Sequence, residues 1–243
     1  MEKKHVVICI ATLCTLFSLI GCNRERDLML DKLKMVEMPE YADGELSKAS
    51  IDELKSAITA LENEVERTVR AGERLGTYYK MVAIRFMDQN MFELAFEHFR
   101  KALDINSANP YLAYYAGLSI AQLAQSVMQP EERERLFDRA EQYYLFAVKL
   151  DGKYTNALYA LSVLYIFELN RPLDAEAYLK RILSRESRHF DAMFLLARVY
   201  VSYGRIDDAI DLYDEIEENS ESEETVEKAI ENRRILIGGS DVR

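Results

Sequence analysis

The side chains best suited to covalent chemistry are three cysteines, Cys9, Cys14 and Cys22, and all three lie within the first 22 residues. A disulfide framework or a cysteine-based zinc site requires cysteines spread through the fold. We therefore expect neither in the body of the protein. The chemistry open to these thiols depends on the N-terminal segment that contains them.

That segment has the organisation of a signal peptide. Lys3 and Lys4 precede an almost wholly apolar run of 15 residues from Val6 to Ile20. A helix that spans a bilayer needs about 20 residues, so this run is too short to be one. The run ends in Leu19-Ile20-Gly21-Cys22, which resembles the lipobox of bacterial lipoproteins. The resemblance implies cleavage between Gly21 and Cys22 and transfer of a diacylglyceryl group to the Cys22 thiol, often followed by a further acyl chain on the new amine.

Such an anchor would fix the location of the protein. Each buried CH₂ of an acyl chain contributes about 0.8 kcal/mol, so two or three chains hold firmly. Asn23 is not the aspartate that retains some Gram-negative lipoproteins in the inner membrane. We expect a signal peptide over 1–21 and a lipidated tether over 22–48, with the protein on a bacterial membrane and facing the periplasm rather than the cell surface. An uncleaved anchor helix and an ordinary secretory signal are the alternatives.

The remaining chemistry-bearing residues form no catalytic constellation. His98 and His189 have no cysteine or second histidine at ligand spacing, and the sequence contains no phosphate-binding glycine loop or nucleophile elbow. The acidic cluster over 217–224 lacks the alternating ligands of a calcium loop. We expect a protein that is not an enzyme and holds no metal or cofactor. The formal net charge of −11 argues against nucleic acid as a partner.

Long helices are favoured, because the chain has only 9 Gly and 4 Pro among 49 % apolar residues. Ser50 to Glu53 matches a capping box, and apolar residues at helical spacing follow, which predicts a helix over 50–70. This helix could pair with a second copy as a coiled coil, but the pattern lasts barely two heptads, so packing on the helices that follow is favoured. Ser222-Glu223-Glu224-Thr225 predicts the start of a capping helix over 222–236, which Gly238-Gly239 ends.

Between these helices a pattern of small and aromatic residues recurs. Asn90 fills a turn position that often needs a left-handed backbone. The residues of the four copies are Tyr79, Val82, Ala83, Phe86, Ala95, Phe99 and Ala102 in the first; Ala113, Ala116, Gly117, Ile120, Ala140, Tyr144 and Ala147 in the second; Leu158, Leu161, Ser162, Tyr165, Ala175, Leu179 and Ile182 in the third; and Met193, Leu196, Ala197, Tyr200, Gly204, Ala209, Tyr213 and Ile216 in the fourth.

Two copies depart from the common length. Ile120 and Ala140 lie 20 positions apart against 9 in an unmodified repeat, so 11 residues are inserted. We expect the first helix to continue through Ala124 and a lengthened second helix to begin at Pro130, which makes a longer hairpin or loop that projects from the stack. The third copy has one extra residue, expected in its turn near Asn170-Arg171-Pro172.

The pattern is similar to that of the tetratricopeptide repeat, and the plan from signal to cap resembles the repeat lipoproteins of spirochaetes. The resemblance implies an all-α fold, a tetratricopeptide-type right-handed superhelical solenoid of antiparallel helix pairs with an N-terminal extra helix and a C-terminal capping helix. One pair cannot bury its own apolar face, so neighbouring pairs stack. The expected domain spans 49–237, with repeats at about 76–109, 110–154, 155–189 and 190–218.

In this family the first helix of each pair lines a concave groove. The positions that usually face the groove supply the candidate binding residues Lys80, Ile84, Tyr111, Tyr114, Leu118, Tyr159, Val163, Phe194 and Arg198. The fifth position of each repeat is Lys80, Tyr114, Tyr159 and Phe194 in turn, and such aromatics suit recognition of a peptide or helix. The alternative is that the chain's own helices fill the groove. The Lys/Asn clamp by which some relatives hold a C-terminal carboxylate is absent.

Together these features predict a membrane-anchored scaffold or adaptor that binds proteins or peptides in the bacterial cell envelope. The second possibility is an accessory lipoprotein subunit of an envelope transport or secretion system. The partner and the oligomeric state stay open.

Overall fold

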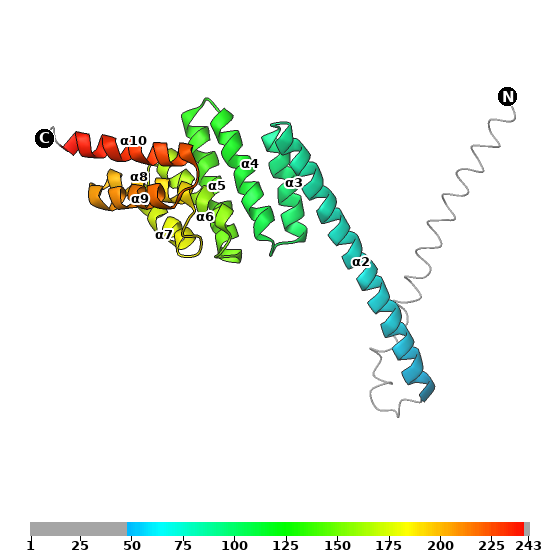
Figure 1. Ribbon diagram of the computed structural model, residues 1–243. Coiled ribbons are helices and arrows are strands. Elements are labelled where there is room, and N and C mark those ends of the chain that lie inside the picture. The colour runs from blue at the N-terminus through cyan, green and yellow to red at the C-terminus, as the bar shows by residue number, and fades with distance from the viewer. Residues whose placement is uncertain (1–47, 241–243) are drawn as a thin grey trace, which may run out of the picture. The chain divides into compact units, whose positions relative to one another are not determined.

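The computed structural model describes residues 48–240, which form helices joined by short turns (Figure 1). The signal segment, the Gly21–Cys22 lipidation site and the tether up to residue 47 lie outside the described residues. The described elements are α2 (Lys48–Asp88), α3 (Phe92–Ile105), α4 (Pro110–Ser126), α5 (Pro130–Leu150), α6 (Thr155–Val163), the π-helical turn η2 (Leu164–Glu168), α7 (Pro172–Leu183), α8 (Phe190–Ser202), α9 (Ile206–Asn219) and α10 (Glu223–Ser240).

The prediction of a separate helix over 50–70 is wrong, because α2 runs without a break from Lys48 to Asp88. The chain between the predicted helix and the first repeat contains Gly72 and Gly76 but no proline. A glycine in a helix costs only about 1 kcal/mol, so it weakens a helix without ending it. The chain divides into two units after Arg70, and the repeats belong to the second unit, which begins at Ala71.

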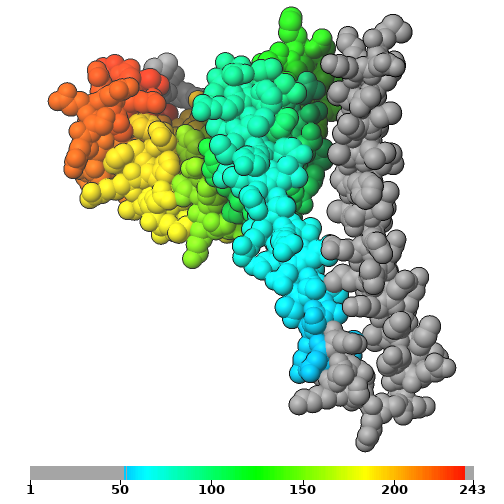
Figure 2. Space-filling model, turned by 90° about the vertical axis from the view of Figure 1, so that its right-hand side faces the viewer, coloured from blue at the N-terminus to red at the C-terminus, as the bar shows by residue number. Residues whose placement is uncertain are grey.

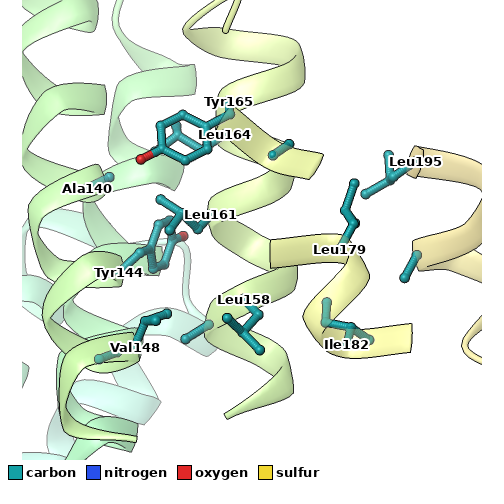
Figure 3. Packing of buried hydrophobic residues seen from close by; sticks show 14 of the residues in the cluster. Ala140, Tyr144, Val148, Leu158, Leu161, Leu164, Tyr165, Leu179, Ile182 and Leu195 are labelled. Atoms are coloured by element: carbon teal, nitrogen blue, oxygen red, sulfur yellow. The ribbon is translucent and has the colours of Figure 1, made fainter. Parts of the chain in front are cut away.

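The second unit is a series of antiparallel helix pairs: the part of α2 from Ala71 with α3, then α4/α5, α6–η2/α7 and α8/α9, with α10 packed on α9. The predicted small residues of the second helices, Ala95, Ala140, Ala175 and Ala209, are all fully buried. In Figure 3, Tyr144 and Val148 of α5 lie against the Leu158 and Leu161 side of α6, so the core is continuous between neighbouring pairs. The all-α solenoid is therefore confirmed.

Three of the turns inside the pairs share one backbone conformation. Asn90, Asn170 and Gly204 have φ of 57°, 50° and 72°, in the left-handed region. The next residue then donates its N–H back to the preceding helix, from Met91 to the carbonyl of Phe86 at 2.9 Å and, in the last pair, from Arg205 to that of Tyr200 at 2.9 Å. The left-handed conformation predicted for Asn90 is confirmed.

The extra residue of the third repeat lies in the first helix and not in the turn. Residues Leu164–Glu168 form a π-helical turn, in which the Leu169 N–H donates to the Leu164 carbonyl at 3.0 Å. The wider turn holds one additional residue, and the following Arg171 N–H still reaches the Tyr165 carbonyl at 2.8 Å. The π turn therefore restores the spacing that the other pairs have.

The longer second pair agrees with the prediction, because α4 continues through Ala124 to Ser126 and α5 begins at Pro130. The predicted end of the capping helix before Gly238 is wrong, since α10 continues to Ser240. Its predicted start is confirmed, because the Ser222 hydroxyl accepts a hydrogen bond from the Thr225 N–H at 3.3 Å. Glycine permits a helix end but does not impose one.

The left-handed turn gives a test of the fold. Gly204→Ala should lower the free energy of unfolding by about 1 kcal/mol, because an L-residue is strained at this φ. Gly72→Ala, inside α2 and with nothing within 4 Å of an added Cβ, should raise it by up to about 1 kcal/mol. Urea denaturation followed by circular dichroism measures both. Shifts of the same sign in the two variants would contradict the assigned backbone conformations.

Candidate functional site

The nine candidate residues lie on the first helix of each pair. They are Lys80 and Ile84 on α2, Tyr111, Tyr114 and Leu118 on α4, Tyr159 and Val163 on α6, and Phe194 and Arg198 on α8. Eight of them are partly exposed, and Arg198 is exposed. The fourth position of the same helices is turned inward, and its Ala113, Leu158 and Met193 are buried. We call the nine residues the first-helix face.

In the second and third repeats, the aromatic residue at the fifth position contacts the ring that precedes the next first helix. The Tyr114 ring lies 5.4 Å from that of Tyr154, the residue before α6. In the same way, Tyr159 stacks at 5.6 Å on His189, which precedes α8. The first-helix face is thus built partly from contacts between repeats. Sequence reasoning missed Tyr154 and His189, although each is a ring directly before a first helix.

Tyrosines crowd the part of the face on α4. The Tyr114 ring lies 4.9 Å from Tyr115 and 6.0 Å from Tyr144, and the rings of Tyr111 and Tyr115 are 4.3 Å apart. Tyr144 is buried against Gly117, where an added Cβ would stand 2.8 Å from the ring. Burial, with the neighbouring tyrosines, raises the pKa of both Tyr111 and Tyr114 to about 12.

A second cluster lies where α8 begins. The His189 Nδ1 accepts a hydrogen bond from the Ala192 N–H at 3.2 Å, so the ring caps α8. Burial, and then the Asp191 carboxylate, raise the pKa of the adjoining Tyr159. An open pocket of about 530 Å³ adjoins this cap. It is lined by Glu186, Arg188, His189, Phe190, Asp191 and Thr225.

Two cations lie on aromatic rings at the C-terminal end of the face. The Arg198 guanidinium is 4.8 Å from the ring centre of Phe167, an exposed residue of the π turn. The ammonium of Lys228, on α10, is 4.9 Å from that of Phe194. Such pairs keep their charge available to a carboxylate while the rings are partly covered. The capping helix therefore covers part of the last aromatic, which single-repeat spacing does not reveal.

The arrangement offers aromatic and aliphatic surface with cations at one end. Among residues 48–240, no group of three or more His, Cys, Asp or Glu side chains is placed to hold a metal ion. In the same part of the chain, no helix combines the length and apolar character needed to cross a membrane. What the face can do with these groups is to bind a chain that carries apolar and acidic side chains.

Helix pairs closed by left-handed turns, with alanines at their contacts, form a solenoid of the tetratricopeptide-repeat type. The sequence model of the tetratricopeptide repeat matches residues 167–224. A TPR repeat-containing protein of Borreliella burgdorferi is 24 % identical over 181 residues, which cover 74 % of this chain and 79 % of that protein. The predicted likeness to a spirochaetal repeat protein is confirmed.

Solved structures show the same fold. A tetratricopeptide repeat protein of Parabacteroides merdae superimposes with a TM-score of 0.58 at 18 % identity, covering 69 % of this chain and 62 % of that one. A thermophilic TPR protein of Thermus thermophilus gives 0.54 at 16 % identity, covering 78 % and 93 %. At these identities the likeness concerns the fold alone.

The tyrosine cluster predicts a loss of stability in alkali. The pKa of Tyr114 is about 12 in the fold against 10.0 for an ordinary tyrosine. The stability that depends on the neutral ring is therefore complete below pH 10 and is lost as the pH rises through 12. Urea midpoints measured across this range should fall. Tyr114→Phe should reduce the fall, whereas Tyr78→Phe, on a more exposed ring, should not. An equal fall in Tyr114→Phe and the parent would contradict the assignment.

Proposed function

We propose that this protein is a lipid-anchored scaffold of the bacterial cell envelope, which holds a protein or peptide partner on its first-helix face. The observation that carries the proposal is the recurrence of a partly exposed aromatic ring, Tyr114, Tyr159 and Phe194, at one position of three consecutive repeats. Partly exposed rings on rigid helices lose little entropy on binding, and Tyr and Arg dominate binding energy in many interfaces.

The charges on the face indicate the chemistry of the partner. The chain has a formal net charge of −11, yet Arg198 and Lys228 both present cations beside the last rings. We expect a partner segment whose apolar side chains contact the tyrosines and whose carboxylate lies near Arg198 and Lys228. The segment need not end in a free carboxylate, because Lys80 and Arg198 alone do not form the clamp used for chain ends.

The location rests on the N-terminal sequence. Lys3 and Lys4, the apolar run that follows and Leu19-Ile20-Gly21-Cys22 support cleavage before Cys22 and acylation of its thiol. A diacylglyceryl group together with a further acyl chain would hold the protein on a membrane without a spanning helix. The anchor would keep the first-helix face close to partners in the envelope.

Labelling with radioactive palmitate tests the anchor. The parent chain expressed in a bacterium should incorporate label and fractionate with membranes, and Cys22→Ser should lose both properties. Cys9→Ser/Cys14→Ser is the matched control and should keep both, because these thiols lie in the segment that is removed. Label retained in Cys22→Ser would contradict lipidation at this residue.

Photo-crosslinking in the native host tests the face. A benzoylphenylalanine placed at Tyr159 should link to one protein reproducibly, whereas the same group at Gln142, an exposed position of α5, should not. Tyr114→Ala/Phe194→Ala should reduce the crosslinked product about tenfold or more, as expected when two aromatic contacts of at least about 1 kcal/mol each are removed. Equal yields from Tyr159 and Gln142 would count against the face as the binding surface.

A further inference from the structure

The first repeat exposes a position that every later repeat buries. At the third position of the first helices, Leu112, Ala157 and Ala192 have 4 %, 0 % and 0 % of their surface exposed, whereas Tyr78 has 62 %. In the later repeats this side faces the second helix of the preceding pair, through the contacts α3–α4, α5–α6 and α7–α8. No described helix plays that part for α2.

The same difference recurs further along α2. At the seventh position, Val82 is 40 % exposed, whereas Ala116, Leu161 and Leu196 are buried. Met81 is 55 % exposed, and Leu75 is exposed as well. We call Leu75, Tyr78, Met81 and Val82 the open edge. Figure 2 looks toward the side of the molecule on which α2, in cyan, lies at the surface.

An apolar open edge is unusual for the end of a solenoid. Terminal repeats normally carry a polar outer side, because nothing stacks on them. Here the exposed residues keep the character of a stacking surface, with Arg85 beside them and likewise exposed. Tyr, Met and Arg are the residue types that interfaces favour over the rest of a protein surface. The open edge therefore calls for a helix from some source.

The other end of the same solenoid offers a helix of the right kind. Beyond α9, α10 has no partner helix of its own among the described residues, and it is held to α9 by ion pairs from Arg233 to Asp214 and to Glu217. Its Ile230 and Ile235 are exposed. The carboxylates Glu223, Glu224, Glu227 and Glu231 are also exposed along it, and Glu231 bridges to Arg234 of the same helix at 2.5 Å.

We infer that the open edge binds α10 of a second copy, so that solenoids associate head to tail. Charge favours this pairing over contact between two open edges. Arg74 and Arg85, the latter also 3.7 Å from Asp88 of its own helix, would meet the carboxylates of α10, whereas a parallel α2–α2 pair would place each arginine beside its own counterpart. The two surfaces differ, so the contact is heterologous, and each copy keeps a free surface for the next.

The size of the contact sets its strength. The area that the four apolar side chains of the open edge can bury is smaller than the roughly 800 Å² per partner that a standard stable interface buries. Association should therefore be weak and reversible, and its extent should rise with protein concentration. The first-helix face is not used, which leaves it available to the partner proposed above.

Charge reversal tests the pairing by sedimentation velocity on the full chain in a mild detergent. The edge variant Arg74→Glu/Arg85→Glu and the cap variant Glu227→Lys/Glu231→Lys should each be monomeric at concentrations where the parent associates. An equal mixture of the two should associate again, because the acidic edge of one variant then meets the basic cap of the other. The unchanged cap of the edge variant also meets the unchanged edge of the cap variant. Circular dichroism checks that both variants fold.

An apolar pair of variants tests the edge itself. Met81→Asp should raise the dissociation constant about tenfold or more. Met128→Asp, at the most exposed large apolar residue of the described chain, is the matched control and should leave it unchanged. A parent chain that stays monomeric, association that survives the cap variant, or a mixture that stays monomeric would each overturn the inference. Crosslinking from Tyr159 is a separate readout, so failure here would not be confused with failure of the proposed function.

Discussion

The structure depends on the close approach of the paired helices, which only small residues allow. Ala95, Ala140, Ala175 and Ala209 stand at equivalent places on the second helices, and all are fully buried. A larger side chain at one of them would push its pair apart. Because each pair contacts only its neighbours, such a shift would pass to every later pair and turn the first-helix face out of line. The alignment of the aromatic rings along that face therefore depends on the alanines beneath it.

Arginine contacts connect the last three pairs. Arg171 lies 4.8 Å over the ring of Tyr165 and bridges to Glu141 of the preceding second helix at 3.1 Å. Arg205 repeats this arrangement, 4.0 Å over Tyr200 and 3.2 Å from Glu176. Both follow a left-handed residue, so the turn aims the arginine at the pair before it. In the first repeat Met91 takes the corresponding place, consistent with a pair that has no described predecessor.

The sequence predicts the pairs because burial on a helix follows from spacing alone. The spacing of small and aromatic residues placed Ala83 and Phe99 inside, and Pro130 marked the inserted helix. The position of Tyr114 on the groove side came from the resemblance to the tetratricopeptide repeat. Spacing carries no information about glycines that a helix tolerates, so the continuity of α2 through Gly72 was missed. The π turn was missed for a related reason, since an inserted residue has the same sequence signature in a helix or a loop. Tyr154, His189 and Lys228 were missed because they lie outside the first helices, at the caps of α6 and α8 and on α10.

A repeated fold permits a comparison that a single site does not. The fifth position is partly exposed in all four repeats, so its exposure belongs to the repeat itself and marks a surface that runs along the solenoid. The third position is buried wherever a preceding pair exists and exposed only at Tyr78, so that exposure arises from the end of the stack. The two surfaces therefore have different physical origins. Changing one need not change the other, because they lie on different sides of the first helices.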